Sequence, residues 1–131
     1  MGLFNNIFKS NKEEQVVNES NINWIPFNSL HQLEEIKELS KQETILIFKH
    51  STRCGISRMV IKMFEKQFDE SMKDLKVYYL DILNFREISN EVGYTFQVLH
   101  QSPQLLVIPN ETAMAHASHY DITTLDVKSY L

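Results

Sequence analysis

A strand-to-helix junction around the single cysteine constrains the fold of this chain more than any other segment. The run from Thr44 to Phe48 is short and apolar, which predicts a buried strand. After Cys54, apolar residues recur every three or four positions with charges between them, which predicts an amphipathic helix from Gly55 to about Glu70. The residues expected on its buried face are Ile56, Met59, Val60, Met63, Phe64 and Phe68. The junction therefore predicts a strand and a helix joined by a short loop that carries the thiol.

Cys54 lies where a thiol would be reactive. The first amides of a helix lack partners within the helix, and together with the helix dipole they favour a thiolate. Thiolate is the form that attacks disulfides. Free cysteine is often a small buried hydrophobe, but Cys54 follows a polar loop and lies outside the apolar stripe of the helix. We therefore favour a reactive role for this residue.

The neighbours of Cys54 offer charge and a hydroxyl group. Lys49, His50 and Arg53 are cations or potential cations that would stabilise a thiolate. Ser57 stands where the second cysteine of a Cys-x-x-Cys pair would be, so a mixed disulfide at Cys54 must be resolved by an outside thiol. Two roles for Ser57 remain open. Its hydroxyl either hydrogen-bonds the thiolate or satisfies a local amide.

Composition narrows the functional classes. The chain has 131 residues, 43% hydrophobic and 23% charged, as expected of one soluble globular domain. Its formal net charge is −4 and no segment concentrates lysine or arginine, so nucleic-acid binding has no electrostatic footprint. A single cysteine excludes an intramolecular disulfide framework and suits a reducing cytoplasm. No apolar run approaches the roughly 20 residues of a transmembrane helix.

The amino-terminal residues 1–23 are expected to be an extension outside the domain. Apolar residues at positions 3, 4, 7 and 8 are enough for about two amphipathic helical turns, and a polar linker follows. The segment is either a frayed extension or a weak docking element for a membrane or a partner. The folded domain is expected to cover residues 24–131.

The rest of the chain predicts alternating strands and helices. Strands are expected at 24–27, 44–49, 77–82, 104–108 and 112–117, with Pro26 marking an edge strand. Helices are expected after a Ser29–Gln32 capping box, at Gly55, after an Asn84–Glu87 cap with Gly93 at the end, and after a Thr123 cap with Asp126 and an Ile122–Val127 staple. Strands separated by helices imply parallel pairing, and the closing hairpin adds antiparallel strands. This order predicts an α/β fold, a thioredoxin-like three-layer sandwich with a central mixed sheet of four or five strands flanked by helices.

Ser102-Pro103 precedes the strand expected at 104–108. Proline is tolerated at a strand entry. In thioredoxin-like folds, a cis-proline at this place faces the active thiol, and its neighbouring backbone pairs with substrate. A cis X-Pro bond costs only about 0.5–1 kcal/mol relative to trans, so we expect a cis peptide here.

Three segments together resemble the monothiol bacilliredoxins of the bacillithiol system. They are Lys49-His50-Ser51-Thr52-Arg53-Cys54-Gly55-Ile56-Ser57, then His100-Gln101-Ser102-Pro103-Gln104, then Ala117-Ser118-His119-Tyr120-Asp121-Ile122-Thr123. The resemblance covers residues 24–131. One position departs from the family's usual Cys-Pro-Ile-Ser, because Gly55 replaces the proline. Glycine supplies an amide that proline lacks and makes the turn looser.

The resemblance implies a cytoplasmic protein of bacteria that use bacillithiol in place of glutathione. Cys54 would be the attacking cysteine, taking bacillithiol from bacillithiolated client proteins and being released by free bacillithiol as co-substrate. The amides of Gly55, Ile56 and Ser57 would stabilise the thiolate, and Lys49 or Arg53 would receive the malate carboxylates of bacillithiol. The other residues expected to contact the substrate or the low-molecular-weight thiol are His50, Ser102, Pro103 and Gln104. No resident cofactor and no metal are expected.

Two alternatives remain. Cys54-Gly55-Ile56-Ser57 also resembles the Cys-Gly-Phe-Ser motif of monothiol glutaredoxins, which carry an iron–sulfur cluster between two subunits with glutathione as a ligand. The chain lacks a clear Gly-Gly-x-Asp segment near Ser118 to Asp121 for the glutathione carboxylate. The second alternative is a non-catalytic thioredoxin-like adaptor in which the thiol is incidental.

Overall fold

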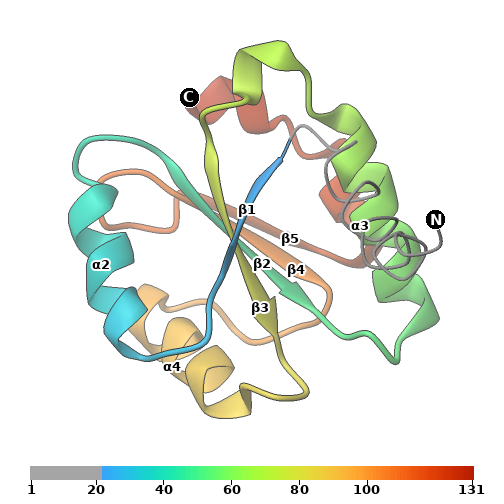
Figure 1. Cartoon of the computed structure of the whole chain (residues 1–131), viewed down its shortest axis with the longest axis horizontal. Helices are drawn as coiled ribbons and strands as arrows, with labels where there is room; N and C mark the ends of the chain where they lie inside the picture. Colours follow the sequence, from blue (N-terminus) through green and yellow to red (C-terminus); the bar gives the residue numbers. More distant parts are fainter. Residues whose placement is uncertain (1–21) are drawn as a thin grey trace, which may run out of the picture.

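Five strands form one mixed sheet in the computed structural model, which describes residues 22–131 (Figure 1). The strand order is β1-β3-β2-β4-β5. Strands β1 and β2 run parallel to β3, whereas β4 is antiparallel to both β2 and β5. The bounds are β1 Asn23–Pro26, β2 Ile45–His50, β3 Lys76–Asp81, β4 Gln104–Ile108 and β5 Ala115–Ser118. The predicted α/β sandwich with a mixed central sheet is confirmed.

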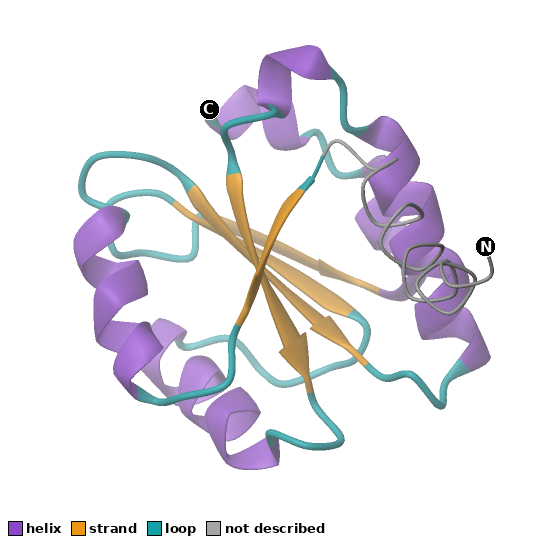
Figure 2. Cartoon of the chain, viewed as in Figure 1, coloured by secondary structure: helices purple, strands orange, loops and turns teal. Residues whose placement is uncertain are grey.

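Helices cover both faces of the sheet (Figure 2). One face carries α2 and α4, and the other carries α3 with the 3₁₀ helices η2 and η3 near the carboxyl end. The bounds are α2 His31–Leu39, α3 Gly55–Gln67, η1 Glu70–Met72, α4 Arg86–Phe96, η2 His119–Thr124 and η3 Val127–Tyr130. The molecule therefore has three layers.

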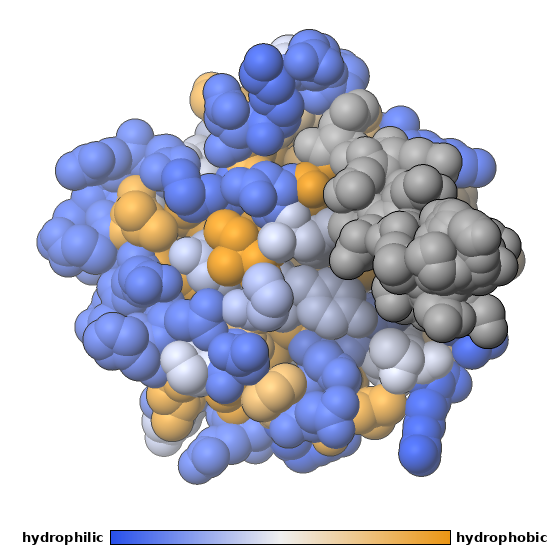
Figure 3. Space-filling view, in the orientation of Figure 1, coloured by the Kyte–Doolittle hydropathy of each residue, from blue (hydrophilic) through white to orange (hydrophobic). Residues whose placement is uncertain are grey.

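Strand β2 lies at the centre of two apolar cores. Successive side chains of a strand point to opposite faces. Ile45 and Ile47 accordingly pack with α2 and α4, whereas Leu46 and Phe48 pack with α3. All six residues of β2 are buried, which accounts for the continuous apolar run in its sequence. Outside these cores, the face shown in Figure 3 is mostly hydrophilic, with apolar residues in separate patches.

Helix α3 buries a narrower stripe than its sequence predicts. Val60 and Phe64 are fully buried, and Phe68 is buried just beyond the helix. Ile56, Met59 and Met63 were expected to face inward with them but remain 42%, 53% and 39% exposed. Each precedes a buried residue by one position, and one step along a helix turns the side chain by about 100°. The sheet therefore covers one ridge of α3 and leaves the adjacent apolar ridge in solvent.

Trp24 joins the edge strand β1 to α3. Its indole Nε1 donates to Glu65 at 3.1 Å. Its ring lies 5.9 Å from that of Phe48, 6.2 Å from Phe64 and 5.6 Å from Tyr79, between ring centroids. The place of β1 at the sheet edge is as predicted, because Pro26 has no amide to donate to a central ladder.

The expected start of the domain at Trp24 stays a prediction, and Ile22 packs on the core ahead of it. Ile22 is already buried in the core beside α3, two residues before the predicted start of the domain. The proposed short amphipathic helix near the amino terminus falls outside the described residues. Within residues 22–131, the structure contains no helix of the length and apolar character needed to cross a membrane.

The starts of α2 and α4 differ from their predicted caps. At α2, the Gln32 side chain accepts the Ser29 amide, but the Ser29 hydroxyl makes no cap and the helix begins after Leu30. At α4, Asn84 does not cap the helix. Its side chain instead donates to Asp81, and the helix begins at Arg86. Asp81 also accepts the Leu83 amide, so the carboxylate at the end of β3 organises this turn.

The end of α4 also differs from prediction. The helix continues through Gly93 to Phe96, and Gln97 ends it in the left-handed region at φ 58°. A Cβ on Gly93 would lie 2.9 Å from the carbonyl oxygen of Val98. Glycine is therefore required here by close approach of the backbone and not by helix termination.

The carboxyl-terminal elements are shorter than predicted. The strand expected at 112–117 is β5 at Ala115–Ser118, because left-handed Asn110 and Glu111 lengthen the turn. The expected final helix is two 3₁₀ helices separated by extended Leu125. Thr123 does not cap a helix, since its hydroxyl donates back to the Tyr120 carbonyl.

Gly93→Ala should lower the free energy of unfolding by about 1–2 kcal/mol, because the clash with Val98 outweighs the roughly 0.5–1 kcal/mol that alanine gains in a helix. Gly55→Ala is the matched control, since a Cβ there meets nothing within 4 Å. Urea unfolding followed by circular dichroism measures both. Equal stability of the two variants would contradict the close approach at Gly93.

Candidate active site

Cys54 is the N-cap residue of α3. Its backbone is extended, and its carbonyl accepts the Arg58 amide at 3.0 Å, which closes the first helical turn. An N-cap side chain commonly accepts the amides of the second or third helical residue, which here are Ile56 and Ser57. The Cys54 side chain makes no capping hydrogen bond and is partly exposed. A sulfur anion at this position would therefore meet first-turn amides and the positive end of the helix.

Exposed residues lie on both sides of the thiol. Arg53 precedes it, and Gly55 and Ile56 follow it. Within residues 22–131, no carboxylate forms an ion pair with Arg53. Of the three expected cations, Arg53 is the one that the structure leaves in solvent beside Cys54.

Ser57 and His50 form a buried hydrogen-bonded pair beneath the loop. Ser57 Oγ accepts the Ser51 amide at 3.1 Å and lies 2.7 Å from His50 Nδ1. Burial lowers the pKa of His50, a shift that Asp81 opposes and Arg58 reinforces, so the ring is neutral at pH 7. A neutral ring nitrogen can accept the Ser57 hydroxyl proton while the oxygen receives the Ser51 amide.

This pair decides between the two expected roles of Ser57. The hydroxyl satisfies a local amide, and among the described residues no hydrogen bond joins it to Cys54. His50 is likewise not the expected cation beside the thiolate, because its ring is buried and neutral. The Ser57 and His50 side chains lie beneath the Cys54 loop and hold it through the Ser51 amide.

Lys49 points away from His50, to the face of the sheet covered by α4. The side chain is fully buried, and its Nζ donates to the Ser89 carbonyl at 3.2 Å and lies 3.1 Å from His100 Nδ1. The expected role of Lys49 as a cation that receives the thiolate or a substrate carboxylate is therefore not supported. Burial lowers the pKa of its ammonium to about 8.

His100 links this buried lysine to the loop before β4. Its Nδ1 also lies 3.2 Å from the Ser89 hydroxyl. Partial burial, then the charges of Lys49 and Arg86, lower the pKa of His100. The ring is therefore neutral at pH 7, and its Nδ1 can accept a hydrogen bond from the Lys49 ammonium. Through this contact β2 holds the start of the 100–103 loop.

The Ser102-Pro103 peptide at the end of this loop is cis, as predicted. The Pro103 carbonyl accepts the His119 amide at 3.0 Å. Gln104 was expected to contact substrate, but its side chain is buried and donates to the Leu99 carbonyl at 3.0 Å. Its backbone lies between β2 and β5, opposite Lys49 and Ser118. The Gln104 side chain therefore closes the loop.

Ser102 lies in the same loop, one residue before the cis-proline. Its Oγ is buried and, within the part of the chain that the structure describes, makes no hydrogen bond. Buried hydroxyls are normally satisfied. Ser102 therefore has hydrogen-bonding capacity that the described residues do not use.

The two loops of the candidate site lie at the same end of the central strands. Strands β2 and β4 are antiparallel with Lys49 opposite Gln104, so the end of β2 lies beside the start of β4. Cys54 follows the end of β2 closely, and Pro103 immediately precedes β4. The register therefore brings the thiol loop and the cis-proline loop to the same end of these strands.

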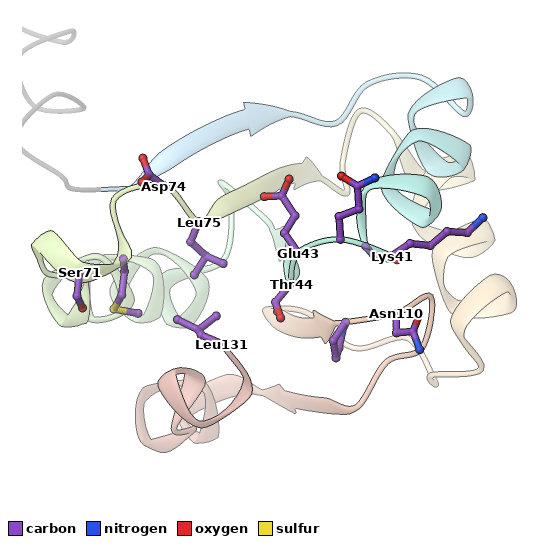
Figure 4. Close-up of a pocket in the computed structure, with 12 residues that line it drawn as sticks. Lys41, Glu43, Thr44, Ser71, Asp74, Leu75, Asn110 and Leu131 are labelled. Carbon is purple, nitrogen blue, oxygen red and sulfur yellow. The ribbon is translucent and has the colours of Figure 1, made fainter.

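The large cavity in Figure 4 lies at the opposite end of β2 and β4. It has a volume of about 520 Å³ and is lined by residues that include Thr44, just before β2, and Pro109, just after β4. A six-residue strand is about 20 Å long, which separates this cavity from the Cys54 loop. The cavity lining contains no cysteine or histidine, so it does not offer the chemistry of Cys54.

The site contains one nucleophile and is suited to exchange through a single sulfur. Within residues 22–131, no three His, Cys, Asp or Glu side chains are grouped to hold a metal ion. Sequence reasoning assigned no role to Ser89 or His100. The only signal for the Lys49–His100 contact was a lysine in an otherwise apolar strand, and its partners become visible only when α4 is packed on the sheet.

Lys49→Met should remove a pH dependence of stability. The folded pKa of about 8 lies below the ordinary 10.5, so between these values the unfolded state binds more protons and stability rises with pH. Between about pH 7.5 and 9.5, the free energy of unfolding of the unmodified protein should rise by about 2 kcal/mol relative to Lys49→Met. Urea titrations under reducing conditions measure it, and parallel pH curves for the two proteins would contradict the buried ammonium.

Solved thioredoxin-fold structures resemble this architecture. A protein described as a candidate oxidoreductase with a thioredoxin fold is 28% identical with a TM-score of 0.66, covering 82% of this chain and 89% of its own. Schistosoma mansoni thioredoxin is 16% identical with a TM-score of 0.66, covering 86% of this chain and 99% of its own. Trypanosoma brucei brucei thioredoxin is 18% identical with a TM-score of 0.65, covering 82% and 88%. These likenesses establish the thioredoxin fold.

A sequence model of one family matches most of the domain. The family is described as Monothiol bacilliredoxin BrxC, and its match covers residues 25–127. That range includes Cys54, the loop that carries it, the cis-proline and the part-buried contact between Lys49 and His100. The chain therefore belongs to the monothiol bacilliredoxin family.

Proposed function

We propose that this protein removes bacillithiol from bacillithiolated client proteins by monothiol exchange at Cys54. The observation that carries the proposal is the position of Cys54 as the partly exposed N-cap residue of α3. Its side chain makes no capping hydrogen bond, so the first-turn amides of the helix are available to a thiolate. Family membership supports thiol redox chemistry. The proposal adds the identity of the thiol, the nature of the clients and a cytoplasmic location.

In the first step, the Cys54 thiolate attacks the bacillithiol sulfur of the client mixed disulfide. The bond between client sulfur and bacillithiol sulfur breaks as the Cys54–bacillithiol bond forms. The client leaves as a thiolate that takes a proton from solvent. First-turn amides of α3 stabilise the attacking anion, because they have no acceptor within the helix.

The second step regenerates the protein. The chain contains one cysteine, so free bacillithiol must attack the mixed disulfide at Cys54. Bacillithiol disulfide forms and Cys54 returns as a thiolate. Bacillithiol is therefore a co-substrate, and a separate reductase must restore it.

The loop before β4 supports substrate positioning. Among the described residues, no backbone hydrogen bond involves Ser102, and its hydroxyl has no partner. An extended client segment can pair with a free backbone in the manner of an added strand. Ser102 would provide that pairing, while Pro103 and Gln104 are held by β5 and by the loop itself.

Arg53 is the residue we assign to the carboxylates of bacillithiol. It is exposed beside the thiol, whereas Lys49 is committed to Ser89 and His100. A guanidinium can hold a carboxylate through two parallel hydrogen bonds. We therefore assign to Arg53 alone the carboxylate-binding role that was expected of Lys49 or Arg53.

Cys54→Ser should abolish transfer of bacillithiol from a bacillithiolated peptide. Intact-mass spectrometry follows the adduct on the protein, with a glutathionylated peptide of the same sequence in parallel. We expect rapid bacillithiol transfer to the unmodified protein and slow glutathione transfer. Preferential glutathione transfer, or transfer to the Cys54→Ser variant, would overturn the proposed function.

Arg53→Gln should lower kcat/KM for the bacillithiolated peptide by about two- to fivefold at low salt, since an exposed ion pair is worth up to about 1 kcal/mol. The effect should fade at high salt because exposed charges are screened. Lys37→Gln is the matched control, on α2 at the other face of the sheet. Stopped-flow or quenched-flow kinetics measure both, and equal losses in the two variants would argue against a local role for Arg53.

A further inference from the structure

Helix α3 presents to solvent an apolar ridge that begins at the active cysteine. The ridge consists of Ile56, Met59 and Met63, each more than a third exposed. Tyr120 from η2 extends it, since its hydroxyl lies 3.6 Å from the Met59 sulfur and the residue is 47% exposed. Methionine side chains adapt to varied partners and are common at binding surfaces that accept more than one sequence.

A cationic groove runs beside this ridge. The groove has a volume of about 450 Å³ and is lined by Gly55, Arg58, Met59, Lys62, Met63 and Lys66. Within residues 22–131, no carboxylate forms an ion pair with any of its three cations. This concentration of positive charge contrasts with the net charge of −4 for the whole chain. The groove is therefore lined by three positive side chains and two apolar ones.

We propose that this ridge and groove, the α3 groove, dock an acidic and apolar segment of the client protein next to its mixed disulfide. This inference rests on the proposed exchange at Cys54 and names the sequence class of the clients. The apolar side chains of the client cover Met59 and Met63. Its carboxylates pair with Arg58, Lys62 and Lys66.

The position of the groove identifies the occupant as a protein segment. Its lining begins at Gly55, the residue after the nucleophile. From Gly55 to Lys66 the helix rises about 16 Å, the length of roughly five extended residues. During the first exchange step the client's mixed disulfide lies against Cys54, so the client segment that carries it can follow this path. A nucleic acid or a lipid surface carries no such disulfide.

The charges also favour an acidic segment in kinetic terms. Complementary charge steers encounter and raises association rates. An acidic client meets a molecule of the same net sign, so a local positive groove beside the thiol orients its approach. A basic segment would be attracted to the molecule as a whole but repelled at this groove.

The first test measures docking without chemistry. Fluorescein-labelled peptides of about eight residues, long enough to cover the groove, alternate Leu or Phe with Glu in one version and with Lys in the other. Fluorescence anisotropy with the full-length Cys54→Ser protein should show the acidic peptide binding at least about fivefold more tightly at low salt. The difference should vanish at about 0.5 M salt, where charges are screened beyond a few ångströms.

Charge reversal in the groove provides the matched comparison. The variant Lys62→Glu should bring the acidic-to-basic affinity ratio down to about 1. Lys37→Glu makes the same kind of charge change on α2 and should leave the ratio as it was. Circular dichroism confirms that both variants are folded. If Lys37→Glu lowers the ratio equally, the preference comes from the net charge of the protein, and the proposed docking at the α3 groove is wrong.

The second test measures exchange and separates this inference from the proposed function. The same peptides, bacillithiolated on a terminal cysteine, are followed by intact mass with the unmodified protein. Faster transfer from the acidic peptide supports the groove, and equal transfer overturns it. If neither peptide transfers bacillithiol, the proposed function fails while the anisotropy result still decides the docking. Binding of anionic lipid vesicles with no binding of the acidic peptide would also overturn the proposal.

Discussion

The burial of β2 on both of its faces is the constraint on which the rest of the structure depends. Its side chains alternate between two cores, and its backbone is paired with β3 on one side and β4 on the other. Because the strand is packed on both faces and paired on both sides, its end and its register are fixed. The loop that follows, with Cys54, starts from that fixed end. The cis-proline loop lies at the adjacent end of β4, so the two loops are positioned by the same pairing.

The same alternation explains the different fates of two adjacent polar residues. Lys49 and His50 are successive, so one enters the layer of α4 and the other the layer of α3. Each is buried with hydrogen-bonding partners, Lys49 with Ser89 and His100, and His50 with Ser57. Neither side chain supplies charge at the thiol. Both side chains instead anchor a loop, one on each side of the sheet. Charge near the sulfur is left to the exposed Arg53 and to the amides of the helix start.

Much of this arrangement was predictable because its causes are local. The apolar run of β2, the edge position of Pro26 and the thiol at a helix start follow from period and residue type. The cis peptide at Pro103 was inferred from the thioredoxin-like order of elements. What sequence could not supply depends on partners distant in the chain. The exposure of Met59 and Met63 depends on how wide a stripe the sheet covers. The burial of Lys49 depends on a carbonyl of α4, and the glycine at 93 on a carbonyl in the loop after that helix. Short polar side chains at Thr123 and Asn84 found other acceptors, which moved the helix ends.

Trp24 gives the molecule a built-in optical reporter. It is the only tryptophan in the chain, and its indole joins the edge strand to α3 through Glu65 and three aromatic rings. An indole in such contacts has an emission that changes when its hydrogen bond or its ring neighbours move. Glu65 lies on α3, whose N-cap residue is Cys54. Changes in α3 near Glu65 can therefore be followed through the emission of a single tryptophan, without a label.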